Sequence, residues 1–245
     1  MPGPSVRELE VAAVRLVLRT SSQSVLEALD HLLARTAEPV SRDCEQIELH
    51  QGPTALRTDG AGMHVAVATG DLPAALRGIL GSALDRRGGA LLHGAGIVID
   101  GQAVLCIAPS EGGKTTLCGK VAGRAPVLSD ETVALRLDDG LPRLAGTLFW
   151  SGPALPTAGG LFPLSAICFL RKGAEALLAL PQSEALSELL LEWHLPERPG
   201  ASADALARAS ALVAQIPLFT LRTTLESDPL PLLRKAAAST LRRAV

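Results

Sequence analysis

Aromatic residues are scarce in this chain: Phe, Trp and Tyr make up 2% of 245 residues, and Tyr is absent. Proteins that bind single-stranded nucleic acid stack bases on aromatic side chains, so this composition argues against that function. The 23 Lys and Arg residues do not exceed the 25 Asp and Glu residues, and the net charge is −2. A chain without a basic excess is a poor candidate for nucleic acid or an anionic membrane surface. We expect neither among its partners.

Cysteine is also rare, with four widely spaced residues and no C-x-x-C pair, which argues against a cysteine zinc site. Cys106 and Cys168 lie in apolar runs and are expected to be small core residues. No apolar stretch reaches the length of a membrane span, and residues 1–7 lack the basic-then-apolar order of a signal peptide. We therefore expect a cytoplasmic protein with reduced thiols.

Hydrophobic residues make up 47% of the chain and charged residues 20%, which predicts a packed core. The length suits one sizeable domain, or one domain with a small appendage. We expect a boundary near 70–88, which divides an N-terminal α+β segment (1–70), a candidate docking module, from a larger domain (71–245).

Hydrophobic spacing and turn residues predict alternating short strands and helices. Residues 8–19 favour a strand over a helix, and 147–165, rich in Gly and Pro, read as loops. The expected strands are 44–50, 54–58, 63–68, 90–93, 95–99, 103–107, 126–129, 132–137, 166–170 and 217–222. The expected helices are 24–35, 71–85, 114–122, 182–193, 202–215 and 229–243.

The most informative segment runs from the apolar residues 103–107 through a loop of small residues to Gly113-Lys114-Thr115 and a helix. This order is typical of a phosphate-binding P-loop, where backbone N–H groups and the helix dipole favour an anion. Lys114 would reach the β- and γ-phosphates, and the Thr115 hydroxyl would bind Mg²⁺. The predicted nucleotide-binding residues are Ser110, Glu111, Gly112, Gly113, Lys114, Thr115 and Thr116.

Two positions depart from the usual pattern G-x-x-x-x-G-K-[ST]. Ala108 replaces the first Gly, which is acceptable if its φ is negative. Glu111 would repel phosphates unless it faces solvent. The plain alternative is a strand–turn–helix unit that binds nothing.

An acidic pair, Asp130 and Glu131, follows the strand after the predicted loop helix. We expect that strand to lie beside the P-loop strand, which would bring Asp130 to the edge where ligands gather in α/β sheets. Adjacent residues of an extended chain point opposite ways, so one carboxylate should face the nucleotide. His93, just before the hairpin, is a further candidate, while His31, His50, His64 and His194 are weaker ones.

The order His93-Gly94, a hairpin at Asp100-Gly101, Gly-Lys-Thr and an acidic pair after the next strand resembles the kinase domain of HPr serine kinase/phosphorylase. It also resembles smaller HPr-kinase-like proteins of bacterial peptide-modification gene clusters. The resemblance is good over 88–137 and looser over 140–222. It implies an α/β (α+β) fold like that of phosphoenolpyruvate carboxykinases, with a P-loop on a mixed core sheet, and an oligomer would be unsurprising.

Carried over by position, the resemblance implies that Asp130 accepts the hydroxyl proton, Lys114 holds phosphates and His93 lies near the reacting phosphate. Thr115 and Glu131 would hold Mg²⁺. The second acid of the family is Asp, so Glu131 is a departure that moves a carboxylate by about one C–C bond, and about 1 Å can cost 100-fold in rate.

The expected function is ATP-dependent phosphorylation of a serine, or another alcohol, on a peptide or small protein, in ribosomal-peptide modification. Two alternatives stay open: a nucleotide-binding regulatory module without catalysis, and a kinase of a small molecule such as an amino acid or sugar.

Overall fold

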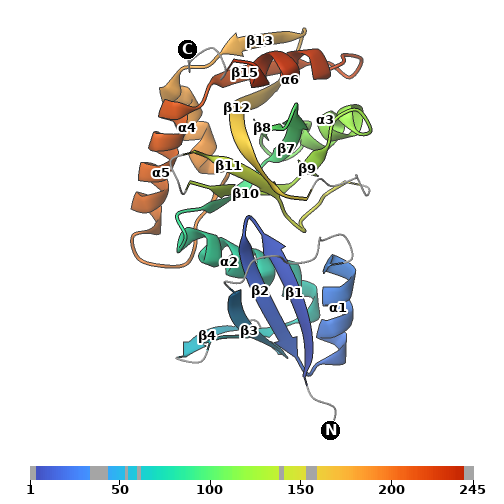
Figure 1. Cartoon of the computed structure of the whole chain (residues 1–245), viewed down its shortest axis with the longest axis vertical. Coiled ribbons are helices and arrows are strands. Elements are labelled where there is room, and N and C mark those ends of the chain that lie inside the picture. The colour runs from blue at the N-terminus through green and yellow to red at the C-terminus, as the bar shows by residue number, and fades with distance from the viewer. Residues whose placement is uncertain are drawn as a thin grey trace.

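The computed structural model describes residues 4–33, 44–52, 55–59, 62–137, 141–152 and 159–239. Within these ranges the chain is a mixed α/β protein built on two sheets (Figure 1). One sheet is formed by the N-terminal strands, and the other by the strands that follow α2. Both sheets contain parallel and antiparallel pairs, as the expected mixed sheet requires.

The N-terminal sheet has the strand order β1-β2-β3-β5-β4. Residues 8–19, expected to be a strand, form two strands that turn at Ala12-Ala13, both with positive φ (52° and 61°). The predicted helix 24–35 is present as α1. The elements are β1 (Ser5–Val11), β2 (Val14–Thr20), α1 (Gln23–Leu33), β3 (Cys44–Gln51), β4 (Ala55–Asp59) and β5 (Gly62–Val67).

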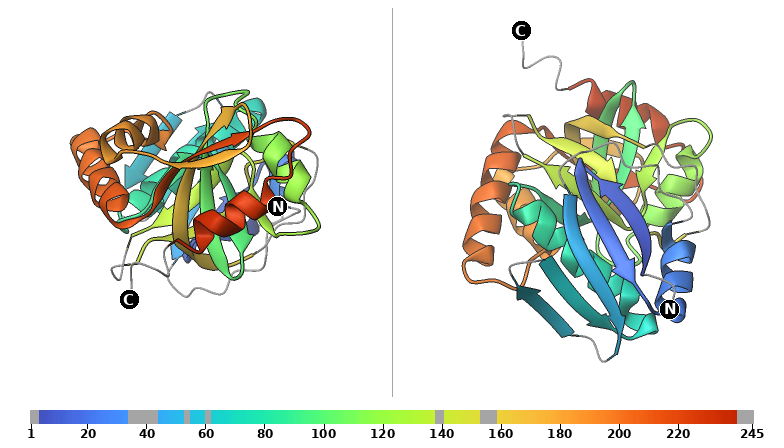
Figure 2. Two further views of the ribbon diagram at one scale, coloured as in Figure 1. Left: turned by 90° about the horizontal axis from the view of Figure 1, so that it is seen from above. Right: turned by 60° about the horizontal axis from the view of Figure 1, so that its bottom comes forward.

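A single core connects this sheet to the rest of the molecule. The short η1 (Thr69–Asp71) leads into α2 (Leu72–Asp85), and Leu76 and Leu80 of α2 are fully buried. The same core contains N-terminal side chains such as Leu16 and, from the second sheet, Leu91. In Figure 2 (right), α2 lies behind the N-terminal strands. Residues from both sides of the expected boundary therefore share one hydrophobic core.

The second sheet follows the path β14-β6-β10-β11-β12-β8-β7-β9, and β15 and β13 extend it beyond β12. Its long strand β12 pairs with β11 near its start and with β8 and β15 further along. The strands are β6 (Ala90–His93), β7 (Ala95–Ile99), β8 (Gln102–Ile107), β9 (Val127–Ser129), β10 (Thr132–Arg136), β11 (Arg143–Gly146), β12 (Leu161–Lys172), β13 (Ala176–Ala179), β14 (Trp193–His194) and β15 (Leu218–Thr223).

Helices cover both faces of the strands that carry the loop after β8. Along β8, Leu105 and Ile107 belong to the core under α4 and α5, whereas Val104 and Cys106 belong to the core under α3 and α6. Figure 2 (left) shows α4 and α5 together on one side and α6 crossing the strands. These helices are α3 (Lys114–Val121), α4 (Gln182–Leu191), α5 (Ala201–Gln215) and α6 (Leu230–Ala237).

The predicted hairpin at Asp100-Gly101 is confirmed, since β7 and β8 pair antiparallel across it. The placement of the strand before Asp130 was wrong: β9 pairs with β7, so β7 separates it from β8. The assignment of 147–165 to loops was wrong at its end, because β12 begins at Leu161. The strands β11, β13 and β14 were not expected. The final helix, expected over 229–243, ends at Ala237 and is followed by a turn, and residues 240–243 lie outside the described residues. Among the described residues, no helix is long and apolar enough to cross a bilayer.

Candidate functional site

The loop between β8 and α3 has the backbone geometry of an anion-binding turn. Gly113 caps the helix with φ 96°, a conformation that costs glycine nothing. A Cβ on Gly112 would lie 2.6 Å from the Cβ of Ala108 and 2.8 Å from the Pro109 carbonyl oxygen, so only glycine fits there. Ala108 is buried and is not among the described residues with positive φ, which satisfies the condition set by the sequence.

Glu111 is the unusual residue of this loop. Its φ of 60° lies in the left-handed region, where a side chain costs about 1–2 kcal/mol. The residue is exposed, so its carboxylate has access to water and does not need to face an anion bound in the loop. Ser110 and Thr116 are exposed as well.

Lys114 is buried at the start of α3, with 6% of its surface exposed. Its Nζ donates to the carbonyl oxygens of Ala108 at 2.5 Å and Pro109 at 3.2 Å, so the amine lies across the mouth of the loop. Burial lowers the pKa of Lys114, while the negative charges of Glu192 and Asp130 act to raise it. The lysine and the Asp130 carboxylate thus belong to one electrostatic environment.

Asp130 is fully buried and faces the start of α3. Ser151 donates to it twice, from its backbone N to Oδ1 at 3.2 Å and from its Oγ to Oδ2 at 3.0 Å. The Ser151 Oγ also lies 3.0 Å from the Thr115 Oγ1. A Cβ on Gly152 would have no room, because it would lie 2.7 Å from Thr115 Cγ2 and 2.8 Å from Asp130 Oδ2. Thr115 and Asp130 therefore meet through one serine.

Glu131 faces away from Asp130, as expected for adjacent residues of an extended chain. Its Oε1 accepts a hydrogen bond of 2.8 Å from Arg77 of α2, whose guanidinium lies 4.6 Å from the centroid of the Phe149 ring. A cation held at Thr115 would meet Asp130 rather than this ion pair. The metal-binding role expected of Glu131 stays a prediction.

His93 is the last residue of β6 and is close enough to Lys114 to feel its charge. Burial and the Lys114 charge lower the pKa of His93, so the imidazole is neutral at pH 7. His194 on the neighbouring β14 is more strongly affected: burial, with the charges of Arg77 and His93, lowers its pKa to about 4. Thr132 lies directly across from His93 in the sheet. The buried atoms His194 Nε2, Arg77 Nε and Thr132 Oγ1 have no hydrogen-bond partner in the described part of the chain, which leaves polar capacity for a bound group or water.

Two cavities flank this constellation. One, of about 410 Å³, is lined by Gly112, Gly113 and Thr116 of the loop and α3, and by residues of β12 and β15. The other, of about 340 Å³, is lined by Arg77, Glu131, residues 148–150 and Gly152, and by further residues of α1 and α2. Both are within the size range of small-ligand sites.

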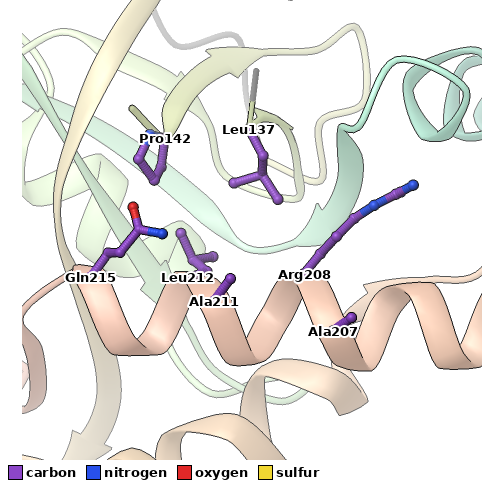
Figure 3. A pocket seen from close by; sticks show the side chains of 7 residues that line it. All are labelled: Leu137, Pro142, Ala207, Arg208, Ala211, Leu212 and Gln215. Carbon is purple, nitrogen blue, oxygen red and sulfur yellow. The ribbon is translucent and has the colours of Figure 1, made fainter. Parts of the chain in front are cut away.

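A third cavity, of about 300 Å³, lies away from these residues between α5 and the β10–β11 connection. Figure 3 shows Leu137 and Pro142 across it from the α5 side chains. Its cation, Arg208, hydrogen-bonds Asp85 at 2.6 Å. The walls of this cavity are mostly apolar, and its one charged side chain is already paired with Asp85. We therefore assign it no chemistry.

Sequence reasoning placed Lys114, Thr115, Asp130 and His93 near one another, and the structure brings them to one region. It missed Ser151 and Arg77, and it ranked His194 only as a weaker candidate. Ser151, which follows Trp150, and Arg77, which lies within an amphipathic helix, belong to no recognisable sequence motif. His194 comes near His93 only through strand pairing.

Comparisons with known proteins complete this description. The profile of the family described as SynChlorMet cassette protein ScmC matches residues 73–228, from the start of α2 to just before α6. The structure of the Hpr(Ser) kinase/phosphatase from Coxiella burnetii is similar with a TM-score of 0.36 and 12% identity, covering 63% of this chain and 97% of that chain. No curated protein matches the sequence. Because the profile covers more than half of the 245 residues, the chain belongs to the SynChlorMet cassette protein ScmC family.

Proposed function

We propose that this protein is an ATP-dependent, Mg²⁺-requiring kinase with a P-loop at 108–116, and that it phosphorylates a serine or other hydroxyl of a peptide or small protein. The observation that carries the proposal is the hydrogen-bonded line from Thr115 through Ser151 to Asp130, beside the Lys114 amine. It supports a site in which the Lys114 cation binds phosphate and the nearby Asp130 carboxylate accepts a proton. The motif resemblance to HPr serine kinases supports the same chemistry.

The residues present fit ATP and Mg²⁺. Within the described residues, the Lys114 amine donates to loop carbonyl oxygens, which a phosphate would replace with a stronger, charged partner. The hydroxyl of Thr115 is a hard oxygen ligand of the kind that Mg²⁺ prefers. The 410 Å³ cavity beside Gly112 and Gly113 has room for a nucleoside.

In this proposal Lys114 neutralises charge on the transferred γ-phosphoryl group, and the N–H groups of the loop orient it. Mg²⁺, which Thr115 would hold, would supply further charge neutralisation on the phosphates. The acceptor hydroxyl takes the place of the Ser151 Oγ as the hydrogen-bond partner of Asp130. Asp130 then accepts the proton of that hydroxyl. Neutral His93 donates a hydrogen bond without adding charge.

The 340 Å³ cavity is the proposed acceptor site, because it opens at Glu131, residues 148–150 and Gly152, beside Asp130. Leu32 of α1 lines it, which supports the proposal that the N-terminal segment 1–70 acts as a docking module beside the kinase domain 71–245. The volume also suits a small molecule, so a kinase of an amino acid or sugar is the second candidate.

A third candidate is a nucleotide-binding regulatory module, favoured by the ion pair that holds Glu131 to Arg77. Calorimetry with ATP and Mg²⁺, followed by mass spectrometry of a serine-containing peptide library incubated with the protein, separates the three. A kinase binds ATP and adds one phosphate to a peptide. A regulatory module binds ATP without loss of the γ-phosphate, and absence of binding by folded protein would contradict all three.

Two variants test the assigned roles. Lys114→Ala should abolish ATP binding, because it removes the cation at the loop. Asp130→Asn should bind ATP normally and lose turnover by about 10²- to 10⁴-fold, the usual contribution of a general base. Full turnover by Asp130→Asn would remove Asp130 as the base.

A further inference from the structure

Three potential metal ligands meet on the outer face of the N-terminal sheet, away from the site of the proposed kinase. Glu48 and His50 are two residues apart on β3, and His64 is the register partner of Glu48 on the adjacent parallel strand β5. The flanking residues Ile47 and Leu49 are fully buried, so Glu48 and His50 project to the opposite, outer side. Strand pairing thus brings His64 next to Glu48 and His50, which precede it by 16 and 14 positions in the sequence.

The ligand atoms of this cluster converge. The Glu48 Oε2 lies 3.2 Å from the His64 Nδ1 and 3.7 Å from the His50 Nε2, and the three lie within 4.8 Å of one another. The two imidazole rings are stacked, with centroids 6.1 Å apart and an interplanar angle of 10°. Zinc–nitrogen and zinc–oxygen bonds of about 2.0–2.2 Å in a tetrahedron place ligand atoms roughly 3.4 Å apart. Two of the contacts already have this spacing, and a small rotation of the His50 ring would close the third.

The charge and chemistry of the cluster favour a zinc-like cation over magnesium. Two neutral imidazoles and one carboxylate carry a net charge of −1, and imidazole nitrogen suits Zn²⁺, whereas Mg²⁺ prefers oxygen. Arg19, the register partner of Glu48 on β2, hydrogen-bonds Gln46 through its guanidinium. Three protein ligands on rigid strands leave a fourth position for water.

We propose that Glu48, His50 and His64 form a binding site for Zn²⁺ on the N-terminal sheet, with water as the fourth ligand. The site is independent of the proposed kinase activity. Because the ligands converge only when β3 and β5 are paired, the ion binds the folded protein and stabilises the sheet.

Calorimetry of the full-length, untagged protein with ZnCl₂ tests the proposal. We expect one Zn²⁺ per chain with a Kd on the order of 1 µM, and a rise in Tm of about 5 °C at a 100-fold excess over Kd. His64→Ala and Glu48→Gln should each weaken binding at least tenfold. His31→Ala, which removes a histidine of α1 outside the cluster, should bind like the wild type.

Cobalt substitution distinguishes this site from a cysteine site. The protein with Co²⁺ should show d–d bands without a thiolate-to-cobalt charge-transfer band, and His50→Gln should lose the d–d bands. Far-UV circular dichroism confirms that each variant is folded. Absence of Zn²⁺ uptake by the wild type would overturn the proposal, and so would undiminished uptake by His64→Ala and His50→Gln.

Discussion

At the scale of single residues, Glu111 illustrates a conflict between local backbone geometry and side-chain chemistry. Its positive φ suits glycine, and its carboxylate stands in a loop proposed to hold phosphates. Glu111→Gly should raise the free energy of unfolding by up to about 1 kcal/mol, because the strain of the left-handed backbone is removed. The affinity for ATP should rise several-fold, since one negative charge leaves the loop. Thermal denaturation and calorimetry measure the two effects.

Glu111→Gln separates these causes, because it removes the charge and keeps the strained backbone. It should reproduce the gain in ATP affinity without the gain in stability. If Glu111→Gln binds ATP no better than the wild type, the carboxylate does not act on the nucleotide.

His194 connects burial to pH dependence. Its folded-state pKa of about 4 lies below the ordinary value of 6.5, so between these pH values the unfolded chain binds a proton that the folded chain does not. Stability therefore falls as the pH drops from 6.5 to 4. Urea denaturation should show a loss on the order of 1–2 kcal/mol between pH 7.5 and pH 5, and His194→Gln should flatten part of this slope. An unchanged slope in His194→Gln would assign the effect to other groups.

At the scale of elements, the strand–loop–helix unit contains two glycines whose surroundings differ: one is crowded by neighbouring atoms and the other is open. Gly112→Ala should reduce ATP affinity about 100-fold, because its Cβ would overlap Ala108 and Pro109 and displace the loop by about 1 Å. Gly119 lies in the following helix α3 with nothing within 4 Å of a new Cβ, so Gly119→Ala should raise stability by about 0.5–1 kcal/mol with ATP binding unchanged. Calorimetry and thermal denaturation of both variants test the pair, and equal ATP affinities would contradict it.

Elements made by contiguous residues could be predicted from the sequence, and those made by distant pairing could not. The hairpin at Asp100-Gly101 and the loop before α3 follow from local turn and helix signals. The position of β9 beside β7 depends on pairing across the sheet, and nothing in its three residues specifies the partner. The segment 147–165 reads as loops because it is rich in Gly and Pro, although β12 begins within it. Ser151, which hydrogen-bonds Asp130, belongs to the same segment.

At the scale of the whole molecule, Asp85 connects the hydrophobic core shared with the N-terminal sheet to the core under α5. It ends α2, which packs in the core shared with the N-terminal sheet, and it accepts hydrogen bonds of 2.6 Å from Arg208 of α5 and from Arg198. Burial alone would raise the pKa of Asp85, but the hydrogen bonds from the two arginines outweigh it and hold the pKa below its ordinary value. A carboxylate with a lowered pKa stabilises the fold above its unfolded pKa, and this contribution disappears as the pH falls through the folded pKa.

Because Asp85 is 8% exposed and its two cationic partners come from distant segments, Asp85→Asn should lower the free energy of unfolding by about 2 kcal/mol or more. Urea denaturation measures the loss, which should shrink at acid pH, where the wild-type carboxylate is protonated too. Asp228→Asn is the matched control, since its ion pair with Arg124 is exposed on both sides and surface pairs contribute little. If Asp85→Asn unfolds in a single transition that is shifted as a whole, the two cores unfold together. Two separate transitions would contradict the link that Asp85 makes between the cores. So would a loss of unfolding free energy in Asp228→Asn equal to that in Asp85→Asn.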